Sequence, residues 1–166
     1  MIMNPRPLSS SLTILALACG LLAAPLPAWS AEPAPAASSK SDPRDSYRSV
    51  QLQELVPASR MTDGRRAIFA PTGVRFQARL AQGPSPQKAE YLQQVMGMMG
   101  ISPLPRVSQR VVLDYGGDKP LAAYVEESAA GRISQELKVG DSRTFYAYHV
   151  YNNRQGPALV ITSFGN

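Results

Sequence analysis

The segment Val74–Leu80 alternates without exception between apolar and polar side chains, and this pattern constrains the fold more than any other part of the sequence. Its apolar positions are Val74, Phe76, Ala78 and Leu80, and its polar positions are Arg75, Gln77 and Arg79. Successive side chains of a β-strand point to opposite faces of the sheet. The segment is therefore predicted to be a strand with one buried and one solvated face.

Four more segments have the apolar patterning of strands. They are Arg106–Tyr115, Leu121–Glu126, Arg143–Asn152 and Ala158–Phe164. Gly116-Gly117-Asp118 is a tight-turn signal between the first two, and Asn153–Gly156 is a turn between the last two. Gly83–Pro86 is expected to end the strand that begins at Val74. With this pattern, Phe76, Val111, Val125 and Val160 are predicted to share one core.

Two segments have helical rather than alternating spacing. Gln87–Met99 places Leu92, Val95, Met96 and Met99 on one stripe, followed by Gly100 as a stop signal. Ala129–Leu137 is predicted to be a second short helix, with Ser128 as its N-cap. The fold class is therefore mainly β with two short helices.

Five strands with a helix between the third and fourth resemble the OB-fold, a five-stranded, partly open Greek-key barrel. The resemblance covers about Gly73–Phe164 and lies in the order of the elements, because that fold has no diagnostic motif. The first predicted helix would then occupy an enlarged loop between strands one and two. A two-layer α+β sandwich built from the same elements is the alternative.

The first thirty residues have the pattern of a secretory signal peptide. Arg6 precedes the apolar stretch Leu12–Ala24, and small residues around Ala28 end the segment. Cleavage is expected after Ser30, which predicts a bacterial protein of the periplasm or the medium, with no transmembrane segment after cleavage. The alternative is lipid attachment at Cys19, although Ala16 and Leu17 reverse the sizes that a lipobox requires.

The next segment, 31–46, is rich in Ala, Pro and Ser and is predicted to be a disordered tether. Residues 47–166 are then expected to form a single domain. The chain has 17 Lys and Arg against 12 Asp and Glu, and 44% of its residues are hydrophobic. This composition excludes an acidic disordered chain and a multi-spanning membrane protein. The single Cys excludes a disulfide framework or a zinc ribbon within this chain.

Arginines occupy the polar faces of the first two predicted strands, which are neighbours in an OB-fold. Such folds bind oligonucleotides and oligosaccharides on the face of strands two and three and with adjoining loops. The predicted ligand-binding residues are Arg75, Arg79, Arg106, Arg110, Tyr124, Asn153 and Arg154. Because export makes nucleic acid an unsuitable ligand, an anionic cell-envelope polymer is expected, such as an anionic polysaccharide or the phosphates of lipopolysaccharide, or else an acidic protein surface. An ordinary solvated strand face is the alternative.

The segment Phe145–Tyr151 carries aromatic residues on both faces, with Phe145 and Tyr151 predicted on one and Tyr146 and Tyr148 on the other. An exposed aromatic patch marks an interaction site. Tyr146, Tyr148 and Tyr151 are therefore candidates for binding an envelope protein. Coverage by this chain's own segment Val50–Arg60 is the alternative.

No residue pattern predicts catalysis, a metal site or a cofactor. His149 is the one histidine, and no nucleophile or acid follows it at a recognisable spacing. The methionines of Met96–Met99 invite a copper hypothesis, but helical geometry places Met96 and Met99 on the predicted core stripe. A non-enzymatic binding module is therefore the predicted function.

Overall fold

The computed structural model describes residues 43–165, and the predicted signal peptide and most of the predicted tether lie outside them. The elements are η1 (Pro43–Ser46), β1 (Arg48–Ser49), α1 (Leu52–Ala58), β2 (Ala67–Pro86), α2 (Glu90–Met98), β3 (Val107–Asp114), β4 (Pro120–Glu126), α3 (Glu127–Glu136), β5 (Ser142–Asn153) and β6 (Gly156–Gly165). The prediction of a mainly β fold is confirmed. Three α-helices are present in this part of the chain, where two were predicted, because α1 was missed.

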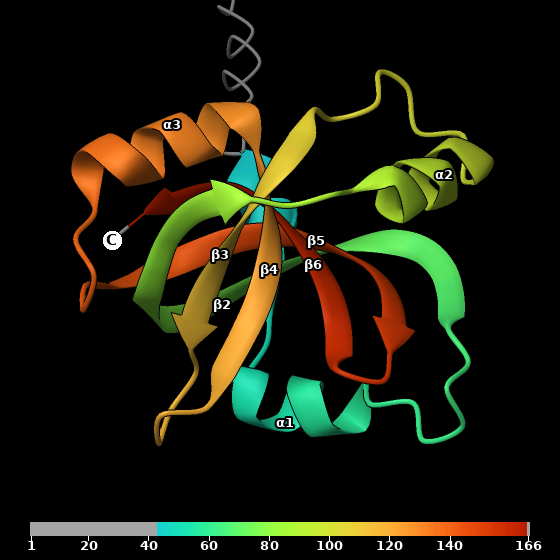
Figure 1. Ribbon diagram of the computed structural model, residues 1–166, viewed down its shortest axis with the longest axis horizontal. Coiled ribbons are helices and arrows are strands. Elements are labelled where there is room, and N and C mark those ends of the chain that lie inside the picture. Colours follow the sequence, from blue (N-terminus) through green and yellow to red (C-terminus); the bar gives the residue numbers. More distant parts are fainter. Residues whose placement is uncertain (1–42, 166) are drawn as a thin grey trace, which may run out of the picture. The chain divides into compact units, whose positions relative to one another are not determined.

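The strands form one mixed sheet in the order β1-β2-β3-β4-β6-β5, and β5 pairs again with β2 (Figure 1). The pairs β1–β2 and β4–β6 are parallel, and the other pairs are antiparallel. The long strand β2 makes this arrangement possible. It pairs with β5 from Ala67 to Arg79 and with β3 from Arg79 to Pro86.

The prediction that Gly83–Pro86 ends the first strand is wrong. These residues belong to β2, where Ser85 lies opposite Arg110 and Pro86 opposite Gln109. The register shifts between Leu80 and Gln82 and again between Gln82 and Ser85. Such irregularities accommodate proline within a strand, so the turn-forming composition here marks bulges rather than a chain reversal.

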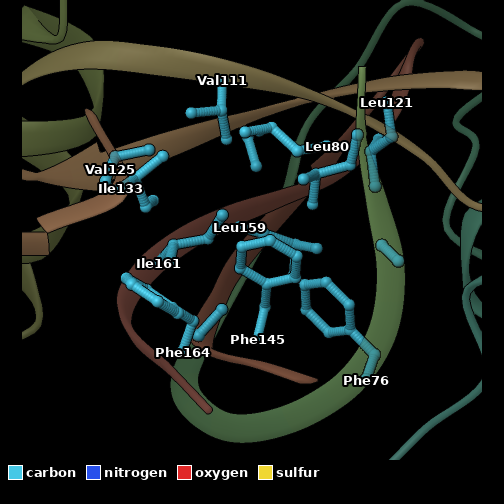
Figure 2. Close-up of a cluster of buried hydrophobic side chains, with 14 of the residues drawn as sticks. Phe76, Leu80, Val111, Leu121, Val125, Ile133, Phe145, Leu159, Ile161 and Phe164 are labelled. Carbon is cyan, nitrogen blue, oxygen red and sulfur yellow. The ribbon is translucent and has the colours of Figure 1, made fainter. Parts of the chain in front are cut away.

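The main core lies on the inner face of the sheet (Figure 2), and helices α1 and α3 contribute buried side chains to it. All four apolar residues of Val74–Leu80 belong to it, as predicted. At its centre Phe145 has no exposed surface and lies between Phe76 and Phe164, with ring centroids 6.2 Å and 6.4 Å away. The alternation in β2 thus identified the buried face correctly.

A second core, the α2 core, lies between α2 and the outer surface of the sheet. Leu92, Val95 and Met96 of α2 pack in it together with a set of strand residues: Val107, Val150, Tyr151, Ala158 and Val160. The predicted placement of Val160 beside Phe76 is therefore wrong. In β6 it is Leu159 and Ile161 that face the main core. Met99 is 38% exposed, so its predicted place on the core stripe is also wrong.

Helices α1 and α3 lie at opposite ends of the strands (Figure 1). From α1, Leu52 and Val56 enter the main core beside the β3–β4 and β5–β6 turns. At the β5–β6 turn, Gly156 has φ +123° and lies against Val56. A side chain at this position would strain the backbone and approach Val56 closely, so the glycine allows the helix to sit on the turn.

Helix α3 follows β4 with no intervening loop and buries Ala129, Ala130 and Ile133. The prediction of Ser128 as N-cap is wrong, because the helix begins at Glu127 and its N-cap is Glu126. The Glu127 N–H donates to the carbonyl of Arg106 at 3.0 Å, which anchors the first turn of α3 to the segment just before β3. Within residues 43–165, none of the helices is long and apolar enough to cross a membrane.

Candidate functional site

The arginines predicted to form one basic face lie in different surroundings. Arg75 and Arg79 point outward from β2, but Arg75 is opposite Tyr146 of β5 whereas Arg79 is opposite Asp114 of β3. Arg110 lies on the outer surface of β3, opposite Tyr124 of β4. Because β2 changes partner along its length, residues four apart on one strand face belong to separate parts of the surface.

Arg79 is already paired with acidic residues. Its guanidinium donates to Asp114, with Nε 3.1 Å from Oδ2, and to Asp118 at 3.1 Å. This hydrogen bonding by Arg79, with a second bond from the Gly116 N–H, lowers the pKa of Asp114. An arginine held between two carboxylates is poorly suited to bind a further anion, so Arg79 is assigned to these ion pairs and not to a ligand site.

Three of the predicted ligand-binding residues, Arg110, Tyr124 and Asn153, come together in one cavity of about 440 Å³. We call it the β3–β4 groove. It is also lined by Gln87, Val112, Pro120, Leu121, Ala122, Ala123, Gln155, Pro157 and Ala158. The remaining two predicted residues, Arg106 and Arg154, are exposed and are not part of its lining.

The groove follows from the way β4 and β6 pair. Their ladder joins Tyr124 to Val160 and Val125 to Ile161, while the earlier part of β4 is paired with β3 on its other side. The start of β4 and the β5–β6 turn therefore line two sides of an opening in the sheet. Gln87, just before α2, lines it as well, and its N–H donates to the Ser108 carbonyl at 2.9 Å.

The polar side chains of the groove are suited to a ligand with hydroxyl groups and a negative charge. Arg110 has no ion-pair partner among the described residues, and no carboxylate lines the groove. The Oδ1 atom of Asn153 accepts the Gln155 N–H at 2.7 Å, which leaves its amide NH₂ as a donor. One guanidinium and three side-chain amides therefore line the same cavity.

Tyr124 connects the groove to the α2 core. It packs against the α2 core, and burial, reinforced by hydrogen bonding with Tyr124, raises the pKa of Tyr151. Tyr151 is 3% exposed and packs edge-on against Tyr91 of α2, with ring centroids 5.3 Å apart. The predicted common face for Tyr151 and Phe145 is wrong, because the register shift between His149 and Tyr151 turns the later residue toward α2.

The other two tyrosines predicted to bind a partner do lie together on the outer surface of β5. The ring of Tyr47 contacts both, with centroids 5.5 Å from Tyr146 and 5.8 Å from Tyr148. Tyr148 remains 41% exposed, and hydrogen bonding of its hydroxyl to Tyr47, together with burial, raises its pKa. A residue preceding β1 therefore covers much of this aromatic face, rather than the segment Val50–Arg60.

His149 is 7% exposed on β5 and its ring packs edge-on against Phe69. Its Nε2 atom lies 2.7 Å from Oδ1 of Asn152. Burial lowers the pKa of His149, the nearby charge of Arg48 adds to this effect, and the bond to Asn152 opposes it. The surroundings favour a neutral imidazole held by one neighbouring amide.

Sequence reasoning missed Gln87 and Gln155, because isolated glutamines in predicted loops carry no signal of their own. Among residues 43–165, no three His, Cys, Asp or Glu side chains come together as metal ligands. No protein-family model, curated protein or solved structure matches the chain.

Proposed function

We propose that the protein is an exported, non-enzymatic binding module with an OB-type barrel, and that it holds an anionic envelope polysaccharide in the β3–β4 groove. The barrel is supported by the pairing order β2-β3-β4-β6-β5 with return to β2, and by the position of α3 between β4 and β5 along the chain. Export is supported by the composition of residues 1–30.

The observation that carries the proposal is the convergence of Arg110, Tyr124 and Asn153 on one cavity. In an OB-type arrangement the groove occupies the surface of strands two and three and the loop after strand four, where such folds bind extended ligands. A guanidinium suits the carboxylates of an acidic polysaccharide, and amides suit its hydroxyl groups. The volume of about 440 Å³ is adequate for part of a sugar chain.

The alternative of a protein partner on the aromatic strand has less support. Tyr151 is buried and Tyr47 packs on Tyr146, so Tyr148 is the predicted partner residue with the most exposed surface. One half-exposed ring is a small fraction of the surface that a stable protein complex requires. We therefore propose the groove rather than the aromatic strand as the binding surface.

The proposal is tested by chromatography of the purified protein on an immobilised acidic polysaccharide with a rising salt gradient. Arg110→Ser removes the guanidinium from the groove, whereas Arg65→Ser removes the same charge from an exposed loop. We expect Arg110→Ser to elute at clearly lower salt and Arg65→Ser to elute close to the wild type. Equal elution of the two variants would mean that retention reflects net charge alone, and the groove would be rejected.

A further inference from the structure

A second cavity, larger than the groove, lies over β2 and β5 and shares no lining residue with the groove. Its volume is about 570 Å³, and we call it the β2–β5 cavity. The outward-facing side chains of two strands line it: Arg75 and Gln77 from β2, and Thr144 and Tyr146 from β5. Ser49 and Gln51, which lie before α1, and Gln53 of α1, whose amide donates to the Tyr115 carbonyl, complete its polar lining.

The path of the N-terminal segment creates this cavity. Ser49 of β1 lies beside Arg75, which is also opposite Tyr146, so three outward residues form one row across the sheet. The Val50 N–H donates to the Arg75 carbonyl at 2.9 Å. Beyond Val50 the N-terminal segment turns away from β2 and enters α1. In the next row Gln77 is opposite Thr144 but has no partner in β1. The cavity occupies the space that a longer β1 would fill.

Charge in this region favours an anion. Arg75 is only partly exposed, it has no ion-pair partner among residues 43–165, and no carboxylate lines the cavity. A partly buried guanidinium without a carboxylate is well suited to form charge-assisted hydrogen bonds with a ligand.

The remaining lining groups indicate the rest of the ligand. Ser49, Thr144 and Tyr146 present hydroxyls, and Gln51, Gln53 and Gln77 present amides, so six of the ten lining side chains both donate and accept hydrogen bonds. Groups of this kind are suited to the hydroxyls of a sugar. The volume of about 570 Å³ lies within the usual range for small-molecule sites.

We propose that the β2–β5 cavity is a second binding site, which takes a free monosaccharide or disaccharide bearing one anionic group, with Arg75 as the residue that holds the charge. The anionic group is a carboxylate in a sugar acid or a phosphate in a sugar phosphate. This site is independent of the proposed function of the β3–β4 groove, because the two cavities have no residue in common.

The site is tested by NMR titration of the purified ¹⁵N-labelled protein with glucuronate, glucose 6-phosphate, glucose and acetate in parallel. We expect one or both anionic sugars to shift the backbone resonances of Ser49, Arg75, Gln77 and Thr144. Glucose and acetate should bind at least about tenfold more weakly, because each lacks one half of the recognised chemistry. Comparison of glucuronate with glucose 6-phosphate identifies the carboxylate or the phosphate as the preferred source of charge.

The Arg75→Gln variant should weaken binding of the anionic sugar by roughly 10- to 100-fold while the spectrum retains its dispersion. Arg75→Lys keeps the charge but loses the planar fork, so a smaller loss is expected. Arg154→Gln, at an exposed position outside both cavities, is the matched control and should leave this affinity unchanged. The proposal is overturned if neither anionic sugar binds, if glucose or acetate binds equally well, or if Arg75→Gln has no effect. The polysaccharide chromatography of Arg110→Ser can succeed or fail independently of this result.

Discussion

Replacement of Phe145 by Ala probes the main core at its most enclosed position. The ring is fully buried between Phe76 and Phe164 and lies on a strand that pairs on both sides, so the space left by truncation has little freedom to collapse. Loss of a buried phenyl ring costs about 3–5 kcal/mol, of which part is the cavity that remains. This is a large share of the ~5–15 kcal/mol that separates folded from unfolded states in proteins of this kind.

Urea unfolding followed by circular dichroism measures this loss. With a urea dependence of about 1.5 kcal/mol/M, a loss of about 3–5 kcal/mol moves the midpoint down by roughly 2–3 M. Thr144→Ala, one residue earlier on the outward face, is the control and should change stability by less than about 0.5 kcal/mol. Phe145→Leu, with a smaller loss, keeps the comparison measurable if the alanine variant does not fold. A loss below about 1 kcal/mol for Phe145→Ala, with unchanged urea dependence, would refute the assignment of the inner face.

Two further predictions concern single positions. Burial lowers the pKa of His149 in the folded protein below its ordinary value of about 6.5. When the pH falls below about 6.5, the imidazole takes up a proton in the unfolded chain but stays neutral in the folded one, so the free energy of unfolding decreases as the pH falls. Thermal unfolding should therefore give a lower midpoint at pH 5.5 than at pH 7.5, and a persistent difference in His149→Gln would contradict this cause. Gly156→Ala should cost roughly 1–3 kcal/mol, because φ is +123° and the new Cβ would lie 3.3 Å from Val56 Cγ1. Gly131→Ala, on an open surface of α3, should instead stabilise by about 0.5–1 kcal/mol, and a common sign for the two glycine variants would refute this reading.

Much of the sheet could be predicted because alternation reports directly which side chains of a strand are buried. This worked where the strand is regular, as in Val74–Leu80. It failed where a bulge changes the alternation. Ser163 lies opposite Tyr146 and Ile161 lies opposite Ala147, so the pairing passes over the residue between them. As a result Val160 faces outward although Phe164 faces inward. A bulge is defined by the pairing of two strands, so the alternation within one strand does not predict it.

Helix α1 was missed for a different reason. It has seven residues, includes Pro57, and packs Leu52, Leu55 and Val56 against the main core. Three apolar residues within little more than one turn are too few to establish a helical period. The helix is stabilised by contacts with distant turns rather than by local preference, and these contacts become visible when the turns are placed in space.

The candidate site was predictable in part. The alternation of β3 correctly placed Arg110 on the outer surface, and the OB resemblance suggested that Tyr124 and Asn153 would be near it. Arg75 is apart from them because it lies between β1 and β5, and Arg79, although beside β3, is paired with Asp114 and Asp118. The sequence shows which side of a strand a residue occupies, but the neighbouring strand decides what it meets there.

The contact between α1 and the β5–β6 turn has a consequence for how the protein folds. Val56 packs against Gly156, and the Met61 N–H donates to the Asn153 carbonyl at 3.0 Å. The segment near the start of the described residues therefore packs on the turn near their end. Pairing of β2 with β5 likewise joins residues far apart in sequence. Folds that depend on such distant contacts form slowly, because long loops must close before any contact stabilises them. A growing chain that has not yet reached β6 should therefore remain largely unfolded, and folding should begin when the last strand becomes available.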